Sequence, residues 1–181
     1  MKIKSKAGKS VYFERWLTPL DHVQYLWLSR AVMSAGGLHL IFEQEKGSPN
    51  IKYVLTLNRR WPIRFTEEAH AVGCIGKYFE TDSKNNKFPH NKKGYPIRTW
   101  KLWATKYVKE INTNHSLSDY KRPKYKDIPQ YLIITGDEWI EFIADCEPDW
   151  TIHKHTSIQK LIDSYSKKNF KSICPREKEP S

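Results

Sequence analysis

The sequence lacks the long apolar segments that cross membranes and has few residues of the kind that build metal or disulfide frameworks. No uninterrupted apolar stretch of about 18 residues occurs, so we expect no transmembrane helix. The residues from Met1 to Lys6 lack the apolar run of a signal peptide. Cys74, Cys146 and Cys174 form no CxxC pair and match no common zinc-module spacing. We therefore expect a cytoplasmic protein with free thiols, no cofactor and no membrane association.

Signature motifs of the common enzyme and nucleic-acid-binding classes are also missing. The sequence contains no P-loop, GxGxxG, GxSxG or HExxH motif. It has no RNP, zinc-finger or GXXG signature and no internal repeat at a fixed period. No reaction is assigned on this basis, and a non-enzymatic role is favoured. Small aromatic-rich proteins of this kind include phage and mobile-element accessory proteins and immunity proteins.

The composition nevertheless indicates a packed core. The chain has 181 residues, of which 39% are hydrophobic and 13% are aromatic, with seven Trp. A chain of this length buries roughly two thirds of its unfolded surface, so it needs no staple to fold. We predict one domain over residues 1–170 and a flexible basic C-terminal tail over residues 171–181.

Local patterns predict an α+β domain, with antiparallel β-hairpins packed against about four helices. Thr18, Pro19 and Asp21 suit the cap and first turn of a helix that would run to about residue 35. Alternating segments at 38–43 and 51–57 predict a hairpin, and 131–135 and 150–153 predict further strands. Helical spacing predicts helices over residues 69–79 and 100–111 and after a cap at Thr156. Residues 138–144 fit a short helix or, alternatively, a second hairpin strand.

Charge is the most informative bulk property. Lys and Arg number 31 against 20 Asp and Glu, a net charge of +11 that attracts polyanions. Several basic clusters lie beside aromatic residues, and phosphates bind cations while unpaired bases stack on flat rings. We predict contact with DNA or RNA through Arg59, Arg60, Trp61, Arg64, Phe88, Lys92, Lys93, Arg122, Lys124, Tyr125 and Lys126. The alternative is an inhibitor or immunity factor that docks on an acidic protein.

Two groups of residues raise the question of catalysis or metal binding. On a helix, Asp137, Glu141 and Asp145 would recur every four residues, and converging carboxylates could hold Mg²⁺ for a nuclease. A solvated helix face is the ordinary explanation for such a run of charge. His153 and His155 would share one side of a strand, but no third ligand is identifiable, so we predict no metal site.

Overall fold

The computed structural model describes residues 12–44, 50–57, 61–67, 93, 97–114, 127–144 and 146–168. Most of them form two antiparallel β-sheets. The five-stranded sheet, called sheet A here, has the order β1 (Tyr12–Arg15), β6 (Thr99–Trp103), β7 (Gln130–Ile134), β8 (Glu138–Ile143) and β5 (Ile63–Glu67). The four-stranded sheet B has the order β2 (Leu26–Ser34), β3 (Gly37–Gln44), β4 (Ile51–Leu57) and β9 (Asp149–Lys154).

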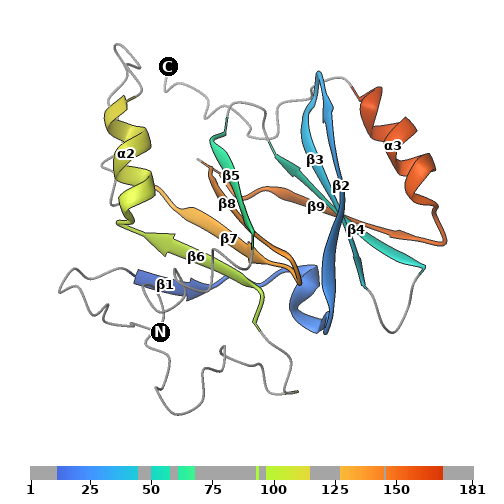
Figure 1. Ribbon diagram of the computed structural model, residues 1–181, viewed down its shortest axis with the longest axis horizontal. Coiled ribbons are helices and arrows are strands. Elements are labelled where there is room, and N and C mark those ends of the chain that lie inside the picture. The colour runs from blue at the N-terminus through green and yellow to red at the C-terminus, as the bar shows by residue number, and fades with distance from the viewer. Residues whose placement is uncertain are drawn as a thin grey trace, which may run out of the picture.

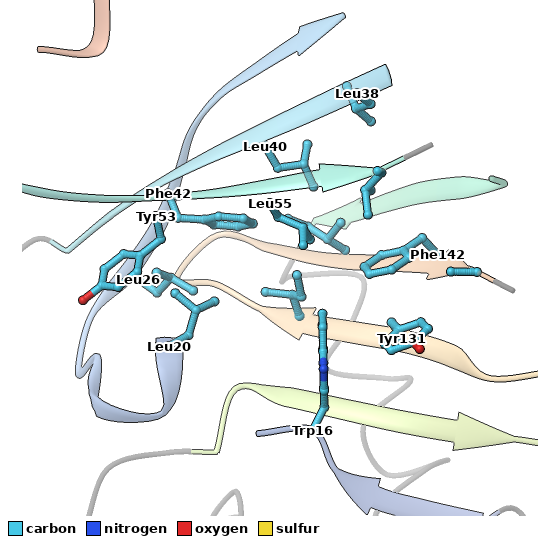
Figure 2. Close-up of a cluster of buried hydrophobic side chains, with 14 of the residues drawn as sticks. Trp16, Leu20, Leu26, Leu38, Leu40, Phe42, Tyr53, Leu55, Tyr131 and Phe142 are labelled. Carbon is cyan, nitrogen blue, oxygen red and sulfur yellow. The ribbon is translucent and has the colours of Figure 1, made fainter. Parts of the chain in front are cut away.

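The main hydrophobic core lies between the two sheets (Figure 2). Phe42 and Leu55 of sheet B and Phe142 of sheet A are fully buried in it. Tyr131 and Phe142 stack with ring centroids 5.0 Å apart, and the ring of Trp16 meets Tyr131 edge-on at 4.8 Å. Burying a large aromatic or aliphatic side chain contributes about 1.5–3 kcal/mol, so this cluster is the principal source of stability.

One helix packs on the outer side of each sheet. Helix α2 (Lys106–Asn114) places Tyr107 and Val108 against Ile143 of sheet A, in a cluster separate from the main core. Helix α3 (Ile158–Ser166) packs on the outer face of sheet B in the same manner. The two helices lie on opposite sides of the molecule, α2 on the left and α3 on the right of Figure 1.

The predicted α+β architecture with about four helices is wrong. The described residues contain nine strands in two sheets, two α-helices and a single 3-10 turn, η1 (Pro19–His22). Most of the apolar residues therefore belong to strands that face another sheet, and the helices only cover the outer faces. The prediction overestimated helix because short apolar runs do not distinguish a buried strand from a helix.

The largest single error concerns the predicted helix over residues 18–35. Thr18 is indeed an N-cap, since its hydroxyl accepts a hydrogen bond from the Leu20 N–H, and Pro19 occupies the first turn. The helical turn ends at His22, however, and the chain continues as β2. A register shift between Leu28 and Arg30 in β2 interrupts its alternation, which removes the period-two signal of a strand.

The predicted helix over residues 100–111 also divides into two elements. Trp100 and Trp103 belong to strand β6, whereas Tyr107 and Ile111 belong to α2. Between them Ala104 has a φ of 58°, a left-handed conformation that costs an L-residue about 1–2 kcal/mol. A continuous helix cannot pass through that residue.

Other predictions are confirmed. Strands β3 and β4 form the expected antiparallel pair, and β7 and β9 occupy the predicted segments 131–135 and 150–153 to within about one residue. The strand alternative for 138–144 is the correct one. Helix α3 exists as predicted, although its cap is Ser157 instead of Thr156.

Some predictions concern residues outside the described ranges. The predicted helix over 69–79 and the tail over 171–181 belong to this group. Cys146 is disulfide-bonded, which corrects the expectation of a free thiol at that position, and Cys74 and Cys174 lie outside the described residues. Within the described ranges, neither helix has the length and apolarity needed to cross a membrane.

Candidate nucleic-acid interface

The positive charge of the protein is unevenly divided between its two sheets and the remainder of the chain. The described residues include 13 of the 31 Lys and Arg and 12 of the 20 Asp and Glu, a net charge of +1. The other +10 belongs to residues outside the described ranges. The described part of the chain is thus nearly neutral as a whole, and the local arrangement of its charges decides where it could attract an anion.

Several of the described cations are held by groups of the protein itself, and one of them, Arg30, donates from Nη1 to the Ser29 carbonyl at 2.7 Å. Five form ion pairs with carboxylates, and Arg98 is buried with its guanidinium donating to backbone carbonyls, including that of Ile134 at 3.1 Å. These cations have little capacity left for an external phosphate. The ion pairs are Arg15–Asp21, Lys52–Glu43, Arg64–Glu141, Lys101–Glu147 and Lys106–Glu110.

Four exposed lysines on and beside α3 differ from these. They have no ion-pair partner among the described residues, and all four lie within 15 residues of one another in the sequence. One acid, Asp163, lies among them on α3 and accepts a hydrogen bond from Gln159 Nε2 at 2.8 Å. We call this group the α3 basic surface, and its lysines are Lys154, Lys160, Lys167 and Lys168.

The local sequence explains how α3 presents these lysines. Ser157 caps the helix by accepting a hydrogen bond from the Lys160 N–H at 3.2 Å. Leu161 and Tyr165 point inward, four residues apart, and are 2% and 1% exposed. Because Lys160 and Lys167 are seven residues apart, almost two full turns, they lie on the same outward side. The inward apolar stripe therefore fixes where the charges point.

The C-terminal end of α3 is attached to sheet B by several contacts. The ammonium of Lys168 lies 3.9 Å from the centroid of the Tyr165 ring. The Lys168 carbonyl accepts a hydrogen bond from Gly36 N–H, in the turn between β2 and β3, at 3.1 Å. These contacts hold the last turn of the helix, and with it the positions of Lys167 and Lys168.

Most of the residues predicted to bind nucleic acid lie outside the described ranges, and the three that are described do not gather at α3. Trp61 is 9% exposed and packs in the inter-sheet core, so we do not retain it as a base-stacking residue. Arg64 pairs with Glu141, and Lys93 is exposed. The undescribed candidates are Arg59, Arg60, Phe88, Lys92, Arg122, Lys124, Tyr125 and Lys126.

The carboxylates considered for a magnesium site do not share a helix face. Asp137 is exposed in the turn before β8, Glu141 is buried within that strand, and Asp145 lies outside the described residues. Residues 137 and 141 are four positions apart on extended chain, which is about 13 Å. Among the described residues no group of three or more potential metal ligands occurs.

Glu141 instead belongs to a buried polar network on the outer face of sheet A. Two nitrogens of the Arg64 guanidinium donate to its two oxygens, and Gln130 Nε2 donates to Oε1. The Thr105 hydroxyl donates to Gln130 Oε1. The Arg64 guanidinium also lies 4.1 Å from the centroid of the Tyr107 ring. Burial raises the pKa of Tyr107, and the positive charge of Arg64 partly opposes this.

The two histidines considered for a metal grip are directed to different partners. His153 Nε2 lies 3.0 Å from the hydroxyl of Tyr165. His155 follows the end of β9 with a φ of 53°, and its N–H donates to the Asn50 carbonyl at 2.7 Å. The strand alternation that would place both imidazoles on one side therefore ends before His155.

The α3 basic surface was missed because its members are dispersed in the sequence. Lys154 lies in a strand, Lys160 is in the first turn of α3, and Lys167 and Lys168 follow the helix. The available signal was the helix prediction itself. A helical projection of residues 157–168, starting from the cap at Ser157, separates Lys160 and Lys167 from the apolar stripe.

Comparison with protein-family models, with curated proteins and with solved structures gave no match to this chain. The functional argument therefore depends on the chemistry of the described residues.

Proposed function

We propose that the protein contacts the phosphate backbone of nucleic acid, without catalysis, through the α3 basic surface. The observation that carries this proposal is the contrast among the described cations. Seven of them are already engaged by carboxylates or carbonyls, whereas Lys154, Lys160, Lys167 and Lys168 are exposed beside a single acid. Lysines that project into solvent from a rigid element release condensed counterions when they meet phosphates, and that release supplies affinity.

The chemistry of this surface supports backbone contact over base recognition. Tyr165, the aromatic residue beside these lysines, is 1% exposed and engaged with His39, His153 and Lys168. Its ring is not available for a base to stack on. We therefore expect binding that is insensitive to sequence and that favours duplex DNA over a single strand, because the duplex has the higher charge density.

The segments outside the described residues carry most of the net charge and would add to binding. Arg59, Arg60, Arg122, Lys124 and Lys126 remain predicted phosphate contacts on these segments.

A cytoplasmic location is part of the same proposal. The disulfide at Cys146 opposes a reducing location, and a thiol count on protein isolated from its native cell would decide between the two.

The test compares two variants that remove the same charge. One replaces the four lysines of the α3 basic surface by Gln. The matched control replaces Lys93, Lys101, Lys106 and Lys109 by Gln, and of these Lys101 and Lys106 are ion-paired and two lie on α2. Fluorescence anisotropy with a labelled 20-base-pair duplex between 50 and 200 mM salt gives the affinity and its salt dependence.

We expect the α3 variant to lose about 0.9 in the slope of log K against log salt for each phosphate contact removed, a total of about 3.6. The control variant should change much less. Equal slopes for both variants, or no binding by the wild-type protein at micromolar concentration in 50 mM salt, would contradict the proposal. Tighter binding to a polyglutamate peptide than to the duplex would favour an acidic protein partner instead.

A further inference from the structure

Helix α3 is attached to the protein through a small cluster that is independent of the main core. The cluster consists of three residues on the outer face of sheet B, Val32, Ile41 and Val54, which contact Leu161 and Tyr165 of the helix. None of these residues belongs to the inter-sheet core. The packing of sheet B against sheet A therefore involves none of the residues that hold α3.

A buried histidine lies directly beneath the helix on this face. His39 of β3 is 1% exposed, and its ring centroid lies 4.7 Å from that of Tyr165. Its Nε2 is 3.0 Å from the Ser34 hydroxyl and its Nδ1 is 3.0 Å from the Thr56 hydroxyl. In a neutral imidazole one ring nitrogen carries a hydrogen and the other does not. One of the two hydroxyls can accept from the first nitrogen and the other can donate to the second, so both hydrogen-bonding positions of His39 are satisfied.

The charged groups on this face are of both signs, and none of them is a hydrogen-bond partner of His39. On α3, Lys168 lies over the Tyr165 ring. On β4, Lys52 is buried and paired with Glu43 of β3, while on β9 the exposed Asp149 lies opposite Thr56. The hydrogen-bond partners of the imidazole are the hydroxyls of Ser34 and Thr56, and the phenol ring of Tyr165 packs against it. A positive charge at this position would be buried without a counterion.

The adjacent His153 of β9 is in a related environment. It lies in register with Lys52 and its Nε2 contacts the Tyr165 hydroxyl. Burial, with a smaller contribution from Lys168, lowers the pKa of His39 to about 4. The same two causes lower the pKa of His153. Both imidazoles that contact Tyr165 are therefore neutral at pH 7 while α3 is docked.

We infer that α3 is a pH-sensitive latch: it docks on sheet B while His39 is neutral, and protonation of His39 releases it. In the released state His39 gains access to water and is protonated with the ordinary affinity of an imidazole. The sheets remain packed, and the apolar strip of Val32, Ile41 and Val54 becomes exposed. The inference does not depend on nucleic-acid binding, because its readout is the docking of the helix.

The direction of the effect follows from proton linkage. Burial in the docked structure, with a smaller contribution from Lys168, lowers the pKa of His39 from 6.5 to about 4, so a released state with an ordinary imidazole pKa would bind more protons at acid pH. Docking is fully favoured above pH about 6.5 and weakens as the pH falls from 6.5 toward 4. Over that interval the docking equilibrium should fall on the order of 100-fold, since each pH unit between the two pKa values is worth up to about tenfold.

Amide hydrogen exchange across a pH series tests this inference. Protection factors, corrected for intrinsic exchange, are measured for the amides of α3 and for those of β3 and β4 between pH 7.5 and 4.5. We expect α3 protection to fall on the order of 100-fold while the strands stay protected. Equal loss in α3 and the strands, or no loss in α3, would overturn the inference.

Three variants connect the effect to His39. His39→Gln keeps a donor and an acceptor but does not titrate, so α3 should lose much less protection at pH 4.5 than in the wild type, and any loss that remains comes from His153. His22→Gln, which alters an exposed histidine of η1, is the matched control and should behave as wild type. Lys168→Gln leaves the buried residues intact and should reduce the acid-induced loss, because Lys168 is one of the two causes of the low pKa. If His39→Gln does not fold, an unchanged loss in Lys168→Gln overturns the inference.

Discussion

The outer faces of the two sheets both bury polar side chains beneath a helix, but they do so with different chemistry. Under α2, sheet A buries a charged pair, Arg64 and Glu141, with Gln130 and Thr105 completing the hydrogen bonds. Under α3, sheet B buries the neutral His39 between two hydroxyls. The first arrangement contains its own counterion, whereas the second remains stable only while its central group is uncharged.

This difference predicts which changes destabilise the packing on each face. On sheet A the removal of Arg64 leaves the buried Glu141 without its cation, which is costly. On sheet B the loss of a hydroxyl partner costs His39 one hydrogen bond, and a buried charge arises only when acid protonates the imidazole. The following predictions compare the two faces in order of expected effect.

The largest effect is expected at the charged face. Arg64→Ala leaves the buried Glu141, whose side chain is 6% exposed, without its cation. Breaking a buried pair typically costs 3–5 kcal/mol, and we expect about 3 kcal/mol because the Arg64 side chain is 39% exposed. Urea unfolding measures the change. Lys106→Ala, which breaks the exposed pair with Glu110, should cost under about 0.5 kcal/mol, and equal losses in the two variants would contradict the distinction.

A smaller effect is expected at the neutral face. Thr56→Val keeps the shape of the side chain but leaves His39 Nδ1 without its hydroxyl partner. An unsatisfied buried polar group costs about 1–3 kcal/mol, so we expect a loss of roughly 2 kcal/mol by urea unfolding at pH 7.5. Thr151→Val, at an exposed position of β9, is the control. An unchanged free energy of unfolding for Thr56→Val would mean that this hydrogen bond to His39 does not contribute to stability.

The cap of α3 should contribute about 1 kcal/mol. Ser157→Ala removes the hydroxyl that accepts from the Lys160 N–H. Thr156→Ala, at the residue that the sequence alone predicts as the cap, should cost less because its hydroxyl donates to the exposed Lys154 carbonyl. Thermal unfolding ranks the two variants. The reverse ranking would show that the cap lies at Thr156 in solution.

The smallest effect is expected for the phenol hydroxyl of α3. Tyr165→Phe keeps the buried ring and removes only the contact with His153, which is half-buried and can bond to water instead. We expect a loss of about 0.5–1 kcal/mol in urea unfolding at pH 7.5. A loss above about 2 kcal/mol would indicate that the hydroxyl, and not the ring, holds α3 on the sheet.

The sequence predicts the local parts of the fold better than their assembly. The β3–β4 pair, β7, β9 and α3 are each recognisable from a pattern of a few residues, and they were found. The sequence patterns predict helices where the structure has the strands β2 and β6. In β2 a register shift interrupts the alternation of apolar and polar residues. In β6 the strand ends just before Ala104, whose left-handed backbone conformation is not predictable from an alanine in the sequence.

The candidate site is harder to predict because it depends on which charges are already compensated. Arg64 was a reasonable phosphate contact from its neighbours in the sequence, yet its carboxylate partner is 77 residues away on β8. Lys154 lies at the end of β9 and Lys168 beyond the C-terminal end of α3, next to the β2–β3 turn, so their relative positions are set only once α3 packs on sheet B. Tertiary pairing decides which cations remain available, and a linear pattern does not contain that information.

The strand order of the two sheets has a consequence for how the chain folds. In sheet B, β2, β3 and β4 are consecutive hairpin-connected neighbours, so they can pair while the ribosome is still making the second half of the protein. In sheet A, β1 pairs with β6, and Arg15 lies opposite Trp100, so a long loop must close before that edge forms. Loop closure of this kind slows folding. We expect the β2–β3–β4 meander to act as the early template on which β9 and the strands of sheet A assemble later.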